Sequence, residues 1–102
     1  MAVLEITTDN FEKEVLQSEV PVLVDFWAVW CGPCQMQGPV IEEAAEAYPE
    51  IKVGKLNVDE QGAVAQKYGV MSIPTLIVFK GGEIYKKAVG FHSLEEIRQL
   101  LP

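Results

Sequence analysis

Trp30-Cys31-Gly32-Pro33-Cys34 joins two stretches of the chain whose hydrophobic patterns differ. The residues before it, 22–27, form a short apolar run rich in β-branched side chains, which predicts a buried strand. The residues after Cys34 follow a helical pattern, so the two cysteines stand where a strand ends and a helix begins. If Cys31 occupies the helix start, Cys34 lies one turn away on the same face, close enough to form a disulfide.

The start of a helix favours a reactive thiolate. Its free N–H groups and the positive end of its dipole stabilise negative charge at Cys31. Pro33 fits the first turn, because its missing N–H costs little there. We therefore expect Cys31 to be exposed and to attack disulfides, and Cys34 to lie behind it and resolve the mixed disulfide.

Two structural roles for the cysteine pair are alternatives to redox chemistry. A disulfide that closes so short a ring is expected to stabilise the fold by only about 2 kcal/mol. A structural zinc site needs about four ligands, whereas the chain has two cysteines and a single distant histidine, His92. The spacing and the strand–helix setting therefore favour a redox function.

The composition indicates one soluble globular domain over residues 1–102. Hydrophobic residues make up 49% of the chain, enough for a modest core, and charged residues 23%. The net charge of −7 argues against nucleic acid and anionic membrane surfaces as partners. No apolar segment approaches the ~20 residues that cross a bilayer, and the N-terminus lacks the pattern of a signal peptide. We expect a cytoplasmic protein, although a chain already cleaved from a signal peptide would look the same.

Asp25 interrupts the apolar run at 22–27. A solvated position on an edge strand is one interpretation. The neighbouring residues are apolar on both faces of the strand, which favours a central strand and a buried carboxylate. Because an isolated buried carboxylate is costly, a functional reason for keeping it is the stronger hypothesis.

Outside these stretches the pattern predicts further strands at 3–6, 51–58, 75–79 and 83–89. Gly81-Gly82 predicts a two-residue hairpin turn between the last two of them. Lys86 and Lys87 suit an edge strand that is protected against further pairing.

Four helices are expected: one from Asp9, one from Cys34 to about residue 48, one at 62–68 and one after Ser93. Asp9 with Glu12, and Ser93 with Glu96, match the capping-box pattern. In the second helix we expect Met36 among the core residues and a kink at Pro39. His92 is expected to be exposed and without a partner.

The central pentapeptide is the signature of the thioredoxin family, and the chain resembles that family along nearly its whole length. A lone CxxC is weak evidence, but several family motifs follow in the right order and spacing. The resemblance implies an α/β fold, with a central five-stranded mixed β-sheet flanked by four α-helices and a single thioredoxin domain over 1–102. The further matching segments are Val24-Asp25-Phe26-Trp27, Lys55-Leu56-Asn57-Val58-Asp59, Ile73-Pro74-Thr75-Leu76, Phe79-Lys80 and Val89-Gly90.

The resemblance also implies a function, the reduction of disulfides in other proteins by a reversible Cys31–Cys34 dithiol. In thioredoxins the residue matching Asp25 lies beneath the disulfide and acts in proton transfer, near a lysine that matches Lys55. The proline matching Pro74 is cis in that family and faces the disulfide, so Ile73 would offer its backbone to an extended substrate. The expected contact surface comprises Trp30, Gly32, Pro33, Ile73, Pro74 and Gly90.

No bound cofactor or metal is expected beside the redox-active disulfide. The expected partners are disulfide-containing proteins and a thioredoxin reductase, a flavoprotein using NADPH, and the chain is expected to be a monomer. Disulfide oxidants and isomerases of the same fold usually carry His between the cysteines, so Gly32-Pro33 favours a reductant. A binding module without turnover is the alternative from another class.

The chain departs from the family pattern at two positions of the rim. Gln35 stands where thioredoxins usually carry Lys or Arg, and Val29 stands where Pro or a polar residue is usual. Neither change removes a catalytic group. The rim is less basic and more apolar than usual, which bears on the choice of partner.

Overall fold

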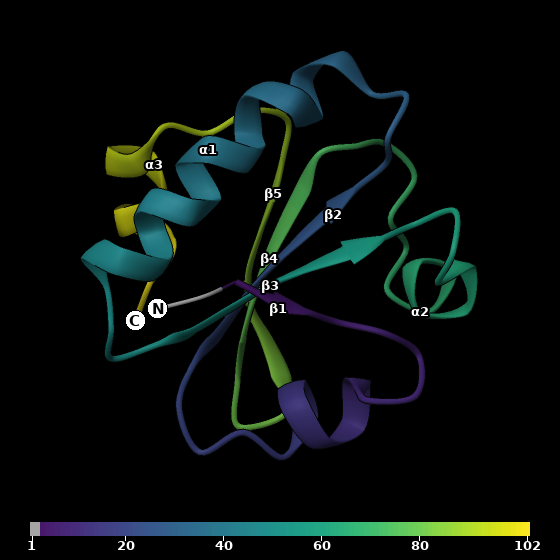
Figure 1. The fold of residues 1–102 in the computed structure, drawn as a ribbon. Coiled ribbons are helices and arrows are strands. Elements are labelled where there is room, and N and C mark those ends of the chain that lie inside the picture. The colour runs from purple at the N-terminus through teal and green to yellow at the C-terminus, as the bar shows by residue number, and fades with distance from the viewer. Residues whose placement is uncertain (1–2) are drawn as a thin grey trace.

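A five-stranded mixed sheet runs through the centre of the molecule (Figure 1). The structure is a computed structural model that describes residues 3–102. The strand order is β1-β3-β2-β4-β5; β1, β3 and β2 are parallel, whereas β4 is antiparallel to β2 and β5 is antiparallel to β4. The predicted α/β class is confirmed. The strands are β1 (Leu4–Glu5), β2 (Val22–Trp27), β3 (Lys52–Asn57), β4 (Thr75–Lys80) and β5 (Glu83–Val89).

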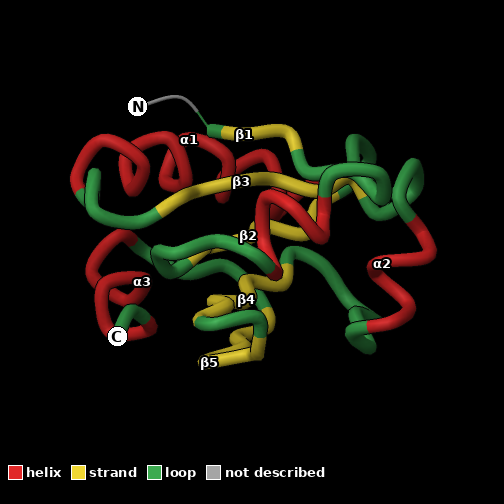
Figure 2. The backbone as a smooth tube through the Cα atoms, turned by 90° about the horizontal axis from the view of Figure 1, so that it is seen from below, coloured by secondary structure: helices red, strands yellow, loops and turns green. Residues whose placement is uncertain are grey.

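Helices cover both faces of the sheet (Figures 1 and 2). On one face lie α1 (Gly32–Ala47) and α3 (Leu94–Leu100), and on the other lie α2 (Gly62–Lys67) and one turn of π-helix, η1 (Glu12–Leu16). Two apolar clusters fill the spaces between sheet and helices. Along β2, Val24 belongs to the cluster beneath η1 and α2, whereas Leu23 belongs to the cluster beneath α1 and α3. This alternation is that of a central strand buried on both faces. Within residues 3–102, every helix is too short or too polar to span a bilayer.

The prediction of a capping box at Asp9 and Glu12 is wrong. The first helix begins later, with Phe11 at the N-cap position and no side-chain cap. Thr7 and Asn10 form the reciprocal pair instead: the Thr7 N–H donates to Asn10 Oδ1 at 2.7 Å and the Asn10 N–H donates to Thr7 Oγ1 at 3.1 Å. This turn occupies the residues just before η1, which is five residues long. Over residues 3–102 the flanking helices are three α-helices and one π-helical turn, where four α-helices were expected.

The core-facing side of α1 differs from the prediction at one position. Met36 was expected in the core but is 62% exposed, and Gln37 is fully buried instead. A helix buries positions three and four residues apart, and Gln37, unlike Met36, keeps that spacing with Cys34 and Ile41. Pro39 lies inside the helix, as predicted.

The last hairpin and the last helix form as the sequence predicts. The Gly81-Gly82 turn has φ of +61° and +82°, values that favour glycine, and it joins β4 to the edge strand β5. Ser93 and Glu96 form the predicted capping box of α3.

Candidate redox site

The two cysteines form a disulfide at the start of α1, with their Cα atoms 5.2 Å apart. Cys31 is the N-cap residue, and the Cys34 N–H donates to Cys31 Sγ at 3.2 Å. Pro33 lies in the first turn, as predicted. The sulfur of Cys31 thus occupies the place where a helix receives an oxygen cap, and a negative charge on it would be stabilised there.

The expectation that Cys31 is exposed is wrong for the disulfide form. Cys31 and Cys34 are each only 4% exposed. They pack with Ala28 and Ile73, and the Ile73 carbonyl oxygen lies 3.7 Å from Cys31 Sγ. The loop before β4 therefore covers the sulfur atoms from the side.

Asp25 lies in the middle of β2, as the apolar neighbours predicted, and is 3% exposed. It stands in register with Lys55 on β3 and Leu76 on β4. Its Oδ1 has no hydrogen-bond partner among residues 3–102. Burial raises the pKa of the Asp25 carboxyl to about 7, and the charge of Lys55 opposes that rise.

A small hollow of about 220 Å³ connects this carboxyl with the disulfide. Asp25 and Lys55 line it from the sheet, and Cys34 lines it from α1, so the carboxyl and the second cysteine share one hollow. Lys55 Nζ lies 5.6 Å from the centre of the Trp27 ring. Gln35 lines the mouth and donates from Nε2 to the Val29 carbonyl oxygen at 3.0 Å. This contact ties the two unusual rim positions to each other.

A second hollow, of about 390 Å³, lies beside Trp30 and Ile73. Trp30 is 71% exposed, and its Nε1 donates to Asp59 Oδ2 at 2.8 Å, which holds the indole while leaving most of it open. Met71 lines the same hollow and is 95% exposed. The sequence did not predict a role for Met71 or Asp59, although Asp59 ends one segment that matches the family and Met71 lies two residues before another.

The Ile73–Pro74 peptide bond is cis, as the resemblance implied. The Gly90 N–H donates to the Pro74 carbonyl oxygen at 2.8 Å, so the Gly90 segment lies beside the Pro74 loop. Gly90 has φ of +96°, and no atom would lie within 4 Å of a Cβ placed there. The backbone at this point is open to an approaching chain. The structure thus places Asp25 and Lys55 in one hollow with Cys34, Ile73 beside Cys31, and Gly90 beside Pro74.

The expectation that His92 has no partner is wrong. His92 is half-buried, and its backbone N–H and C=O both bond to the side-chain amide of Gln37, at 2.9 and 3.0 Å. Its ring Nδ1 lies 2.7 Å from the Gly90 carbonyl oxygen. Gln37 and His92 are 55 positions apart in the sequence, so no local sequence pattern could have predicted this contact.

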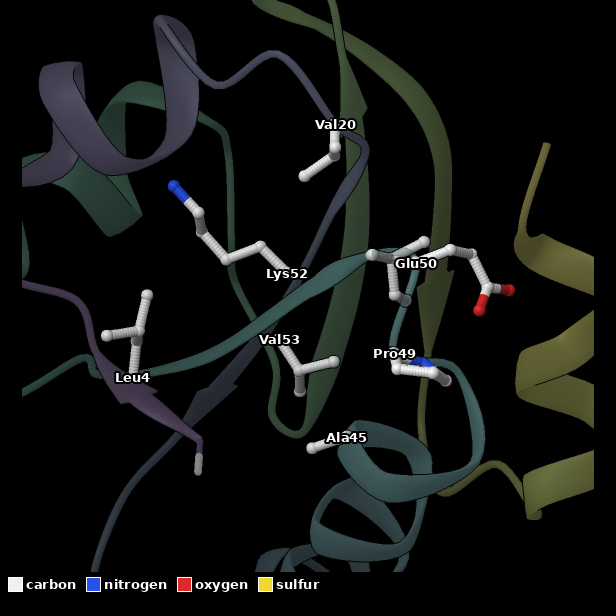
Figure 3. A pocket seen from close by; sticks show the side chains of 8 residues that line it. Leu4, Val20, Ala45, Pro49, Glu50, Lys52 and Val53 are labelled. Atoms are coloured by element: carbon white, nitrogen blue, oxygen red, sulfur yellow. The ribbon is translucent and has the colours of Figure 1, made fainter. Parts of the chain in front are cut away.

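A hollow of about 430 Å³, larger than either of these, lies at the far end of α1, away from the disulfide (Figure 3). Its lining is mostly apolar, from Leu4 and Val20 to Ala45 and Pro49. The amine of Lys52 points away from it, toward Glu14, which accepts its hydrogen bond at 3.0 Å. No nucleophile faces this hollow among the residues that line it. Within residues 3–102, no group of three or more His, Cys, Asp or Glu side chains is placed to hold a metal ion.

Reversible oxidation of Cys31 and Cys34 is the chemistry that this site supports. A helix start stabilises the attacking thiolate, the second sulfur lies one turn away, and a buried carboxyl with a raised pKa lies within the same hollow. Fold and site therefore define a thiol–disulfide oxidoreductase.

Known proteins identify the family. The family model described as Thioredoxin matches residues 2–102. Thioredoxin 1 of Nostoc sp. is 54% identical over 90 residues, which are 87% of this chain and 84% of that protein. The thioredoxin of Alicyclobacillus acidocaldarius is 48% identical over 101 residues, 98% of this chain and 95% of that protein. The thioredoxin of Streptomyces clavuligerus is 56% identical over 85 residues, 83% of this chain and 79% of that protein. The chain belongs to the thioredoxin family, and it is a protein-disulfide reductase that works through the Cys31–Cys34 pair.

Proposed function

We propose that Cys31 attacks the partner disulfide and that Cys34 resolves the intermediate. The Cys31 thiolate bonds to one sulfur of the partner, and the other partner sulfur leaves as a thiolate. Cys34 then attacks Cys31 Sγ, the mixed disulfide breaks, and the second partner sulfur leaves. The partner gains two electrons and the Cys31–Cys34 disulfide forms. The position of Cys31 as the N-cap of α1 is the observation that supports this order.

Asp25 is proposed to accept the proton of Cys34 in the resolving step. A carboxyl with a pKa of about 7 exchanges protons readily near neutral pH, and it lines the same hollow as Cys34. Lys55, in register with Asp25 on the neighbouring strand, adjusts that pKa downward.

The proposed contact surface is the rim around the disulfide. Trp30 and Ile73 line its hollow, and the open backbone at Gly90 lies beside Pro74. Gly32 and Pro33 complete the rim between the cysteines, and a Cβ at Gly32 would meet no atom within 4 Å. An extended partner segment is proposed to lie across these residues, next to the Ile73 backbone.

Cellular context follows from this function. We propose that the partners are disulfide-containing proteins, that a thioredoxin reductase recycles the oxidised form, and that no cofactor is bound. We further propose that the chain is a single monomeric domain over residues 1–102 that carries electrons in the cytoplasm. Its net charge of −7 disfavours binding to nucleic acid or to anionic membranes.

Reduction of insulin disulfides by the chain, with dithiothreitol as electron donor, tests the proposal. We expect the parent to accelerate the reaction well above the dithiothreitol background. The Cys31→Ser, Cys34→Ser double variant is expected to return to background, because both redox atoms are gone. If the double variant still fulfils the cellular role of the parent, the chain acts as a binding module and the proposed function is wrong.

The two thiols of the reduced protein are expected to differ in reactivity. Cys31 should react with iodoacetamide at least about tenfold faster than Cys34, because the helix start and the Cys34 N–H stabilise its thiolate. Peptide mapping after brief labelling measures the two rates. Equal labelling, or faster labelling of Cys34, would contradict the proposed roles.

A further inference from the structure

Gln37 is a fully buried polar residue on the helix that carries the cysteines. It follows Cys34 by one turn and faces the same side of α1. Its side-chain Nε2 donates to the His92 carbonyl oxygen at 3.0 Å, and its Oε1 accepts from the His92 N–H at 2.9 Å. A buried side-chain amide whose N–H and C=O groups both hydrogen-bond to the backbone of one residue fixes the position of that residue closely.

The segment fixed in this way leads to the partner-binding rim. His92 Nδ1 lies 2.7 Å from the Gly90 carbonyl oxygen, and the Gly90 N–H donates to the Pro74 carbonyl oxygen at 2.8 Å. Next to Pro74, the Ile73 carbonyl oxygen lies 3.7 Å from Cys31 Sγ. The contacts thus form a closed circuit that starts from α1, crosses the Gly90–His92 segment and the Pro74 loop, and returns to the disulfide.

We propose that Gln37 is a positioning residue for partner binding. Its amide holds the Gly90–His92 segment against α1, and this segment holds the Pro74 loop in register with the cysteines. The inference rests on the proposed contact surface of Gly90, Pro74 and Ile73. Gln37 touches neither the sulfur chemistry nor the partner, and its effect is confined to substrates that are large enough to use the rim.

Gln37→Met tests this role, because methionine is similarly long and apolar and loses both hydrogen bonds. With insulin as substrate, KM is expected to rise about tenfold, as the loss of buried hydrogen bonds implies. With hydroxyethyl disulfide, a small substrate that needs only the sulfur atoms, the rate is expected to stay within about twofold of the parent. The reduction potential of the Cys31–Cys34 pair is expected to be unchanged. Gln99→Met, at an exposed position of α3, is the matched control and should behave as the parent.

Gln37→Asn is the second variant, which keeps an amide but is one methylene too short to reach both groups of His92. It is also expected to raise the KM for insulin. If the methionine variant does not fold, this variant tests the proposal in its place. Faster hydrogen exchange of the His92 amide in either variant would show directly that the hydrogen bonds between residue 37 and His92 are lost. An unchanged KM for insulin overturns the proposal, and so does an equal loss with both substrates. Failure of the proposed function would be separate, since the parent itself would then not reduce insulin.

Discussion

Asp25→Asn is expected to melt at a higher temperature than the parent at pH 7 and yet to reduce disulfides more slowly. The stability effect comes from the buried carboxyl, whose pKa burial raises from 3.8 to about 7. Between these two pH values the native carboxyl keeps a proton that the unfolded one has lost. The native state then binds more protons, so the free energy of unfolding falls as the pH rises through this range.

The loss stops above about pH 7, where Asp25 is ionised in both states. A pKa change of this size corresponds to roughly 4 kcal/mol at most. Asparagine cannot ionise and avoids the loss, although its amide also needs partners that the site does not supply to Oδ1. A net gain of about 2 kcal/mol would raise the melting temperature by roughly 10 °C.

Activity is expected to change in the opposite direction. Without a proton acceptor in its hollow, Cys34 resolves the mixed disulfide more slowly, and general acid–base groups typically contribute about 10²–10⁴-fold. Thermal unfolding of parent and variant between pH 4 and pH 8, together with insulin reduction at pH 7, measures both effects. The advantage of the variant should disappear as the pH falls toward 4, because the parent regains the stability that ionisation removes while the cost of burying the asparagine amide remains. Asp9→Asn, at an exposed position, is the control and should change neither quantity. A variant that is no more stable at pH 7 and fully active would contradict the proton-transfer role.

Cys34→Ser is expected to lose turnover and to accumulate covalent complexes with partner proteins. Cys31 keeps its place as the N-cap and still attacks, but no second sulfur one turn away can break the mixed disulfide. The variant should therefore reduce insulin at the background rate. Non-reducing electrophoresis should show bands that dithiothreitol removes, and mass spectrometry of these bands would identify the partners.

Cys31→Ser is the matched control for the trap. It lacks the attacking sulfur and should form few complexes, although it retains Cys34. Complexes on Cys31→Ser and none on Cys34→Ser would reverse the assigned order of the two thiols.

Local patterns in the sequence were sufficient for most of the fold. The apolar neighbours of Asp25 predicted a central strand, because a strand buried on both faces has no polar side, and the structure places β2 there. Ser93 with Glu96 predicted the start of α3 correctly. The same pattern at Asp9 and Glu12 failed, since Thr7 and Asn10 form a competing turn just before it. A capping-box sequence shows that a helix can start at a position, but a turn formed by neighbouring side chains can move the start of the helix elsewhere.

The site was predictable where its residues act through their neighbours in the chain, as at Cys31 and Cys34. Where distant residues meet, local patterns were not sufficient, and the proximity of Lys55 to Asp25 was expected only from the family resemblance. The Gln37–His92 pair spans 55 positions and the Trp30–Asp59 pair spans 29, and both depend on how the sheet and helices pack. The low exposure of Cys31 has the same origin, because the covering group is the backbone of Ile73.

The Ile73 backbone that covers the disulfide has a consequence for which molecules exchange electrons with it. With each cysteine only 4% exposed in the oxidised form, a small thiol reaches the sulfur atoms through a narrow opening, so its attack is slower than it would be on an open disulfide. A partner that settles on the rim can approach the Ile73 backbone and the sulfur beneath it. The cover therefore favours electron exchange with proteins that fit the rim, whereas small thiols and disulfides have to reach the sulfur atoms without its help. Such a carrier can hold an oxidation state that differs from that of the surrounding pool of small thiols.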